Sequence, residues 1–131
     1  MFNKKKQPPI KSLIAQGTQI SGNMVFSEGL RVDGAVTGNI RATDDEPSML
    51  VISESASITG EIQADHIIIN GTVKGPIHAS HMLELQPKAR IEGDVRYTAL
   101  EMHQGALVAG QLRPILAGEE KPTLKLAANN G

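Results

Sequence analysis

The sequence of 131 residues contains no cysteine and no tryptophan, and its aromatic residues are Phe2, Phe26 and Tyr97. Without cysteine, the chain can form neither disulfide bonds nor a thiol nucleophile, which agrees with a reducing compartment. Three scattered rings cannot provide a stacking platform for bases, so we expect no binding of nucleic acid. The sequence also lacks an apolar run of the roughly 20 residues that a membrane-spanning helix needs.

The N-terminal residues have little in common with a secretion signal. The lysine run at residues 4–6 is followed by two prolines and Lys11, where a signal peptide has an apolar segment. We therefore expect the chain to stay in the cytoplasm. Residues 1–27 hold four of the 13 basic residues and none of the 14 acidic ones, so a basic tail precedes an acidic body. This division indicates that the tail, and not the body, meets an anionic surface.

A short pattern, an apolar residue two before a glycine and another two after it, occurs six times along the chain. The central glycines are separated by 16, 22, 15, 18 and 17 residues, and the one long interval contains an insertion at residues 43–49. Such self-similarity predicts a β-solenoid, in which stacked coils bury an apolar face that no single coil can bury alone. The central glycines are Gly22, Gly38, Gly60, Gly75, Gly93 and Gly110.

Apolar and polar residues alternate within each repeat, as in a strand with one buried face. We expect the apolar set to point inward and the polar residues between them, such as Arg31 and Glu84, to face water. The repeat glycines share the inward parity, which predicts corners where no side chain has room. The residues expected to point inward include Leu30, Val32, Val36, Ile40 and Ala42 in one coil, and Leu83, Leu85, Ala89, Ile91, Val95 and Tyr97 in another.

These patterns predict an all-β chain with a single solenoid domain of about six coils at residues 17–114. Six coils at the ~4.8 Å strand spacing make a stack roughly 25 to 30 Å tall. Residues 1–16 are expected to form a flexible basic N-terminal tail and residues 115–131 a flexible C-terminal tail. The Pro, Lys and Gly content of both tails argues against a core of their own.

Four sequence features together point to one family: the start Met1-Phe2-x-Lys4, the opening Ile20-Ser21-Gly22-Asn23, the coil Leu30-Arg31-Val32-Asp33-Gly34-x-Val36-x-Gly38-x-Ile40, and the run of repeats through Leu112. With these features the chain resembles the bactofilins over essentially its whole length. The resemblance implies a right-handed parallel β-helix that polymerises end to end, without nucleotide, into non-polar filaments on the cytoplasmic face of a bacterial inner membrane. It also implies a scaffold for cell-shape and envelope-building proteins.

The basic N-terminal segment is expected to target the membrane. In this interpretation Met1, Phe2, Lys4, Lys5 and Lys6 bind anionic inner-membrane lipid. Each lysine near an anionic leaflet contributes on the order of 1 kcal/mol, and the ring of Phe2 can insert at the headgroup level. One tail binds only marginally, whereas many tails on one filament bind together through avidity. The alternative is an ordinary solvated terminus.

The two ends of the solenoid are expected to form the polymerisation interface. No amphipathic helix covers either end in the sequence, and open strand edges with apolar ends invite pairing with another chain. The alternative is a β-helical module that does not polymerise and binds envelope polysaccharide or a partner protein; it would need polar caps on both ends. The expected interface residues are Ile20, Met24 and Phe26 at one end and Leu107, Val108 and Leu112 at the other.

The chain offers little for catalysis or metal binding. The four histidines fall at different positions of the repeat and have no cysteine beside them, so we expect no metal site, no cofactor and no catalytic role. The acidic residues 44–46 lack the alternating oxygen ligands of a calcium loop and are expected to be solvated. The glycine spacing also breaks the six-residue cycle of hexapeptide acyltransferases, which are β-solenoids too, and the sequence predicts no enzyme. The histidines are His66, His78, His81 and His103.

Overall fold

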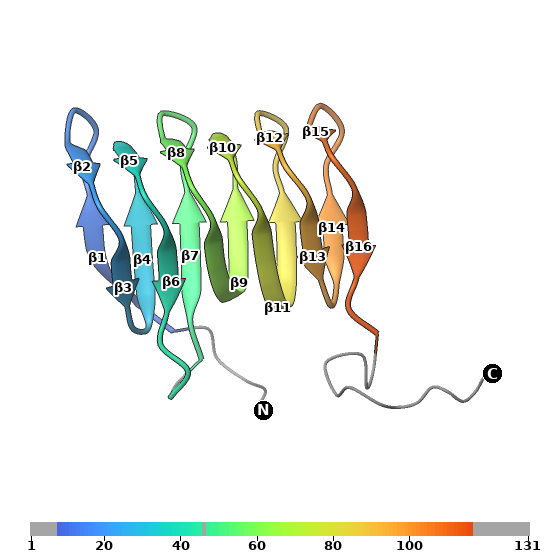
Figure 1. Ribbon diagram of the computed structural model, residues 1–131, viewed down its shortest axis with the longest axis horizontal. Coiled ribbons are helices and arrows are strands. Elements are labelled where there is room, and N and C mark those ends of the chain that lie inside the picture. The colour runs from blue at the N-terminus through green and yellow to red at the C-terminus, as the bar shows by residue number, and fades with distance from the viewer. Residues whose placement is uncertain (1–7, 46, 117–131) are drawn as a thin grey trace.

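The computed structural model describes residues 8–45 and 47–116, and every helix or strand assigned within these ranges is a β-strand. The strands follow one another as a parallel solenoid, with the coils lying side by side in a row (Figure 1). The described residues include no helix that is long and apolar enough to cross a membrane. The predicted all-β solenoid of about six coils is confirmed.

Each coil places one strand or half-strand on each of three faces. Face 1 consists of β1 (Ile10–Ile14), β4 (Gly29–Val32), β7 (Met49–Ile52), the second halves of β9 (Ile62–Ile69) and β11 (Ile77–Leu85), and β14 (Leu100–Met102). Face 2 consists of β2 (Gln19–Ser21), β5 (Ala35–Thr37), β8 (Ser57–Thr59), β10 (Thr72–Lys74), β12 (Arg90–Glu92) and β15 (Leu107–Ala109). Face 3 consists of β3 (Met24–Phe26), β6 (Ile40–Ala42), the first halves of β9 and β11, β13 (Val95–Tyr97) and β16 (Leu112–Pro114). Because β9 and β11 run from face 3 into face 1, these two faces form one ten-stranded sheet, and face 2 is a separate six-stranded sheet.

Equivalent residues of successive coils lie directly against one another. On face 2, Val36 pairs with Ile58, Ile58 with Val73, and Val73 with Ile91. None of these four side chains is more than 2% exposed, and β-branched residues suit a buried, pleated surface. The inward and outward sets predicted from the alternation are confirmed, since the aliphatic inward residues are buried while polar neighbours such as Arg31 face water.

The repeat glycines are the corners that their parity predicts. All six have positive φ angles, between 130° and 154°, a conformation that residues with a side chain rarely adopt. At Gly38 a Cβ atom would also collide with the carbonyl oxygen of Gly22, its counterpart in the preceding coil. The glycines therefore fix where each coil turns between faces 2 and 3.

The insertion after β6 is anchored to the solenoid by Ser48. The Ser48 N–H donates to Oδ2 of Asp65 at 3.1 Å, and the Asp65 N–H donates to the Ser48 hydroxyl oxygen at 2.9 Å. The Ser80 hydroxyl completes the arrangement by donating to Oδ1 of Asp65 at 2.6 Å. The sequence interpretation that counted Met49 in the insertion was wrong, because Met49 begins β7 and its N–H donates to the carbonyl of Glu28.

The regular structure begins earlier than the predicted boundary at residue 17. Strand β1 lies within the stretch that the sequence assigned to the N-terminal tail, yet it pairs with β4. Ile14 points inward and is 7% exposed, so this strand completes the first coil and its core. The other expected tail segments, residues 1–7 and 117–131, lie outside the described residues.

Candidate assembly surfaces

Within residues 8–45 and 47–116, each end of the solenoid presents three strands with an unpaired edge. Among the described residues, β1, β2 and β3 each pair with a strand of the second coil only, and β14, β15 and β16 each pair with a strand of the fifth coil only. These two sets of strands stand at opposite ends of the row in Figure 1. Backbone N–H and C=O groups along such edges can pair with strands of another chain.

The N-terminal end is partly closed by its own side chains. Ile14 and Phe26 are 7% and 8% exposed, while Ile20 and Met24 are half-buried and pack against the core. Phe26 pairs with Ala42 in the next coil, and this small neighbour leaves room for the ring. The sequence placed Phe26 at an open contact surface, whereas the structure places it inside the first coil.

The C-terminal end is more open. Met102 and Leu112 belong to inward columns, in register with Leu85 and Val95, but no further coil of the described residues covers them, and they are 43% and 39% exposed. Val108 continues the column of Ile91 and is half-buried. The sequence analysis did not include Met102 in the interface at the C-terminal end. Its position as the last inward residue of β14 could have indicated it.

Leu107 lies on the flank of the last coil and not in an inward column. It is in register with Arg90, whose side chain faces solvent, and it is 59% exposed. Its predicted place in the interface therefore requires a contact that reaches around the edge of face 2.

The predicted membrane-binding residues lie outside the described residues. These are Met1, Phe2, Lys4, Lys5 and Lys6. Lys11, the fourth lysine of the basic segment, is in β1, and its Nζ lies 3.0 Å from Oε2 of Glu28.

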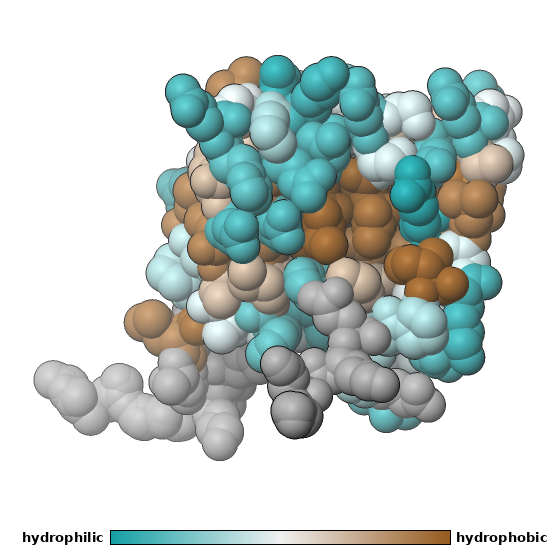
Figure 2. All heavy atoms as spheres, turned by 180° about the vertical axis from the view of Figure 1, so that it is seen from behind, coloured by the Kyte–Doolittle hydropathy of each residue, from teal (hydrophilic) through white to brown (hydrophobic). Residues whose placement is uncertain are grey.

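The outer surfaces of the faces differ in character. On face 3, Arg41, Arg96 and Arg113 occupy the outward position of their strands. On face 1 the outward column includes the half-buried Val51 and Ile68, which are in register with each other and lie between Arg31 and Glu84. Seen from behind, the molecule has hydrophobic side chains gathered at mid-height, with hydrophilic ones beside them (Figure 2). These flanks run along the length of the solenoid and do not belong to its two ends.

The surroundings of Arg31, Asp33 and His66 shift the pKa of each of these groups. Arg31 Nε donates to Oδ1 of Asp33 at 2.8 Å, and this hydrogen bond lowers the pKa of the Asp33 carboxyl. Partial burial of the His66 imidazole lowers its pKa below the ordinary value. None of these groups lies at an end of the solenoid.

Comparison with known proteins decides the family. The sequence model of the bactofilin family, described as polymer-forming cytoskeletal, matches residues 12–113. The chain belongs to the bactofilin family. The match begins inside β1 and ends inside β16, so it takes in all six coils.

Two bactofilins of Myxococcus xanthus (strain DK1622) are similar to the chain. BacO is 25% identical over 111 residues, which cover 85% of each protein. BacP is 26% identical over 101 residues, which cover 77% of this chain but only 40% of BacP, so the chain spans about two fifths of the length of that relative. No solved structure matches the chain. Membership in the bactofilin family supports a cytoskeletal role for the protein.

Proposed function

We propose that this bactofilin polymerises end to end, without nucleotide, into non-polar filaments on the cytoplasmic face of the bacterial inner membrane, where it recruits cell-shape or envelope-building proteins. The observation that carries the proposal is the pair of open coils, each with three strand edges that no other described residue pairs with and with apolar side chains at the end of the core. A second chain docked on such an end pairs the free backbone groups and buries the apolar side chains.

The C-terminal end provides the stronger hydrophobic contribution. A Leu or Met side chain contributes about 1.5–3 kcal/mol when it goes from full exposure to full burial. Met102 and Leu112 are 43% and 39% exposed, so each has roughly 1 kcal/mol left to gain in a junction. Backbone pairing along β14, β15 and β16 adds directionality, because the strands must align in register.

Non-polar filaments require that like ends meet. A junction between two C-terminal ends, or between two N-terminal ends, is related by a two-fold axis and uses the same patch on both chains. The two ends of this chain differ in exposure, with Phe26 buried at one and Leu112 open at the other. Two distinct junctions of unequal strength then alternate along the filament.

Membrane attachment in this proposal depends on polymerisation. The basic segment at residues 4–6 and Phe2 supply a weak affinity for anionic lipid, and the filament multiplies it by presenting many copies. Lys11 contributes less, because it is engaged with Glu28 on face 1. Client proteins bind the flanks of the filament, since the ends are occupied by neighbouring subunits.

Electron microscopy and sedimentation of the full-length protein in nucleotide-free buffer test the proposal. We expect long unbranched filaments and no change on adding ATP or GTP. The sequence also contains no phosphate-binding loop with the spacing G-x-x-x-x-G-K. A stable monomer at all concentrations would instead favour the alternative, a β-helical module that binds envelope polysaccharide or a partner protein.

A further inference from the structure

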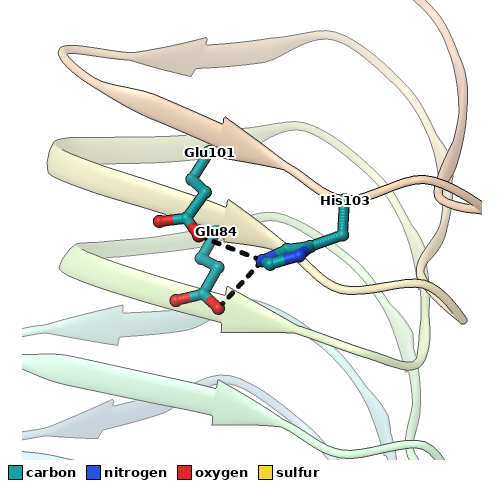
Figure 3. Close-up of side chains that lie close together, drawn as sticks. All are labelled: Glu84, Glu101 and His103. Carbon is teal, nitrogen blue, oxygen red and sulfur yellow. Dashed lines mark ion pairs between the residues drawn. The ribbon is translucent and has the colours of Figure 1, made fainter.

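Glu84, Glu101 and His103 converge on the outer surface of face 1, at the last two coils. Glu84 in β11 and Glu101 in β14 are register partners, so their side chains leave neighbouring strands on the same side. His103 follows β14 directly and has the same outward parity as Glu101. In Figure 3 the imidazole ring and the two carboxylates point toward one another.

The distances between these groups match those of a metal centre. Nε2 of His103 lies 3.1 Å from Oε2 of Glu101 and 3.4 Å from Oε2 of Glu84. All three candidate ligand atoms lie within 4.8 Å of one another. Tetrahedral Zn²⁺ holds nitrogen and oxygen ligands at about 2.0–2.2 Å, which places the ligand atoms about 3.4 Å apart. The separations from His103 Nε2 to the two carboxylate oxygens are therefore already close to the ligand-to-ligand distance in a tetrahedral zinc site.

The ring nitrogen at the centre of this group is buried and makes no hydrogen bond. Nε2 of His103 has almost no solvent-accessible area and, among the described residues, has no hydrogen-bond partner despite the two nearby carboxylate oxygens. The observed arrangement suits a nitrogen lone pair that shares a cation with both carboxylates.

The surroundings of the group also favour a cation. Glu84 and Glu101 are directly opposite on adjacent strands, where like charges destabilise a sheet. A divalent ion neutralises both carboxylates. Gln86 donates from Nε2 to Oε2 of Glu84 at 3.2 Å, which is the kind of hydrogen bond that orients a ligating carboxylate.

We propose that Glu84, Glu101 and His103 form a binding site for a divalent transition metal ion, with Zn²⁺ as its preferred occupant. The mixed nitrogen and oxygen set favours Zn²⁺ over Ca²⁺ and Mg²⁺, which take oxygen ligands. The bound ion links the last coil to the fifth coil. In the sequence, Met102 lies between Glu101 and His103, and its side chain is exposed at the C-terminal end of the solenoid. The bound ion therefore fixes the backbone next to the C-terminal assembly surface.

Titration of metal-stripped, full-length protein with Zn²⁺ by isothermal titration calorimetry tests the site. We expect one Zn²⁺ per chain, and at least a tenfold loss of affinity in His103→Ala and in Glu101→Gln. The matched control is His78→Ala, because His78 projects from face 3, away from the proposed site. We expect the His78→Ala protein to bind Zn²⁺ as tightly as the wild type. Gln86→Ala should lower the affinity by about tenfold, as loss of an orienting partner does.

Two further measurements keep the outcome independent of folding and assembly. Substitution with Co²⁺ should give the visible absorption bands of a four-coordinate ion in the wild type and in His78→Ala, but not in His103→Gln. The same titration of a Leu112→Arg variant separates ion binding from polymerisation. Absence of saturable Zn²⁺ binding by the wild type, or binding that His103→Ala and Glu101→Gln both leave unchanged, would overturn the proposal.

Discussion

Gly75 lies so close to Gly60 in the preceding coil that a Cβ atom on Gly75 would collide with the Gly60 carbonyl oxygen. The same relationship joins Gly93 to Gly75 and Gly110 to Gly93. The corner between faces 2 and 3 is thus a column of backbone with no room for side chains, and each glycine also has a φ angle that side chains disfavour.

Replacing Gly75 with valine should therefore destabilise the fold by about 3 kcal/mol or more, through steric overlap and backbone strain together. Lys74→Val is the matched control, because Lys74 is exposed on the adjacent outward position of β10. Thermal melts compare the two variants, and we expect only Gly75→Val to lower Tm strongly. Equal Tm values for Gly75→Val and the wild type would contradict the assigned corners.

Leu112→Arg should shorten or abolish filaments while leaving the solenoid folded. Leu112 is 39% exposed at the C-terminal end, so the single chain tolerates arginine there, but a junction would bury an unpaired charge at a cost of several kcal/mol. Arg113→Leu, which alters the neighbouring outward position, serves as the control. Electron microscopy gives the filament lengths. Long filaments of Leu112→Arg would exclude the C-terminal end from the contact between subunits.

Phe26→Arg is a less informative test of the opposite end, because Phe26 is buried and the variant would lose stability.

Cross-linking can determine which ends meet. The chain has no cysteine, so Met102→Cys introduces a single thiol at the C-terminal end. If like ends meet, a short bis-maleimide should convert filaments of this variant into covalent dimers and no larger species. Ser21→Cys, placed in β2 at the opposite end, should also give dimers. Cross-linking that appears only when the two variants are mixed would show that unlike ends meet.

Deleting residues 2–6 should abolish membrane binding without loss of filaments, because every inward residue of the described coils remains. Co-sedimentation with anionic and neutral liposomes measures the binding, after subtraction of the filaments that sediment alone. Wild-type binding to anionic liposomes should weaken with salt, since the field is screened within ~8 Å at physiological ionic strength. Phe2→Ala should weaken it at every salt concentration. Equal binding of the deleted and intact proteins would make the segment an ordinary solvated terminus.

Asp65→Ala should destabilise the fold by about 2 kcal/mol, because it removes the acceptor of the buried Ser48 N–H. Asp45→Ala, an exposed position in the same insertion, should change stability by less than about 0.5 kcal/mol. Chemical unfolding in the Leu112→Arg background measures both variants without a contribution from assembly. No difference between the two variants would mean that the insertion is not anchored through Asp65.

Much of the site, by contrast with the fold, was not accessible from the sequence. The repeat identified the end coils, but it did not indicate that Phe26 closes one end while Met102 stays open at the other. Side-chain exposure at an end depends on the size of the neighbours in the next coil, and Phe26 lies against alanine. The proximity of His103 to Glu84 and Glu101 was missed for a similar reason, since the histidines were compared with one another and not with carboxylates in the adjacent coil.

The sequence by itself determined the architecture of this protein, because strand alternation and glycine spacing are local and every coil repeats the same requirement. Val36, Ile58, Val73 and Ile91 could be assigned to the core from parity alone. Only the tertiary structure decided what stacking brings together. Glu84 meets His103, and Ser48 meets Asp65, because insertions and unequal coil lengths set the register between coils. The register between coils depends on the lengths of complete coils, and no single repeat of the sequence contains that information.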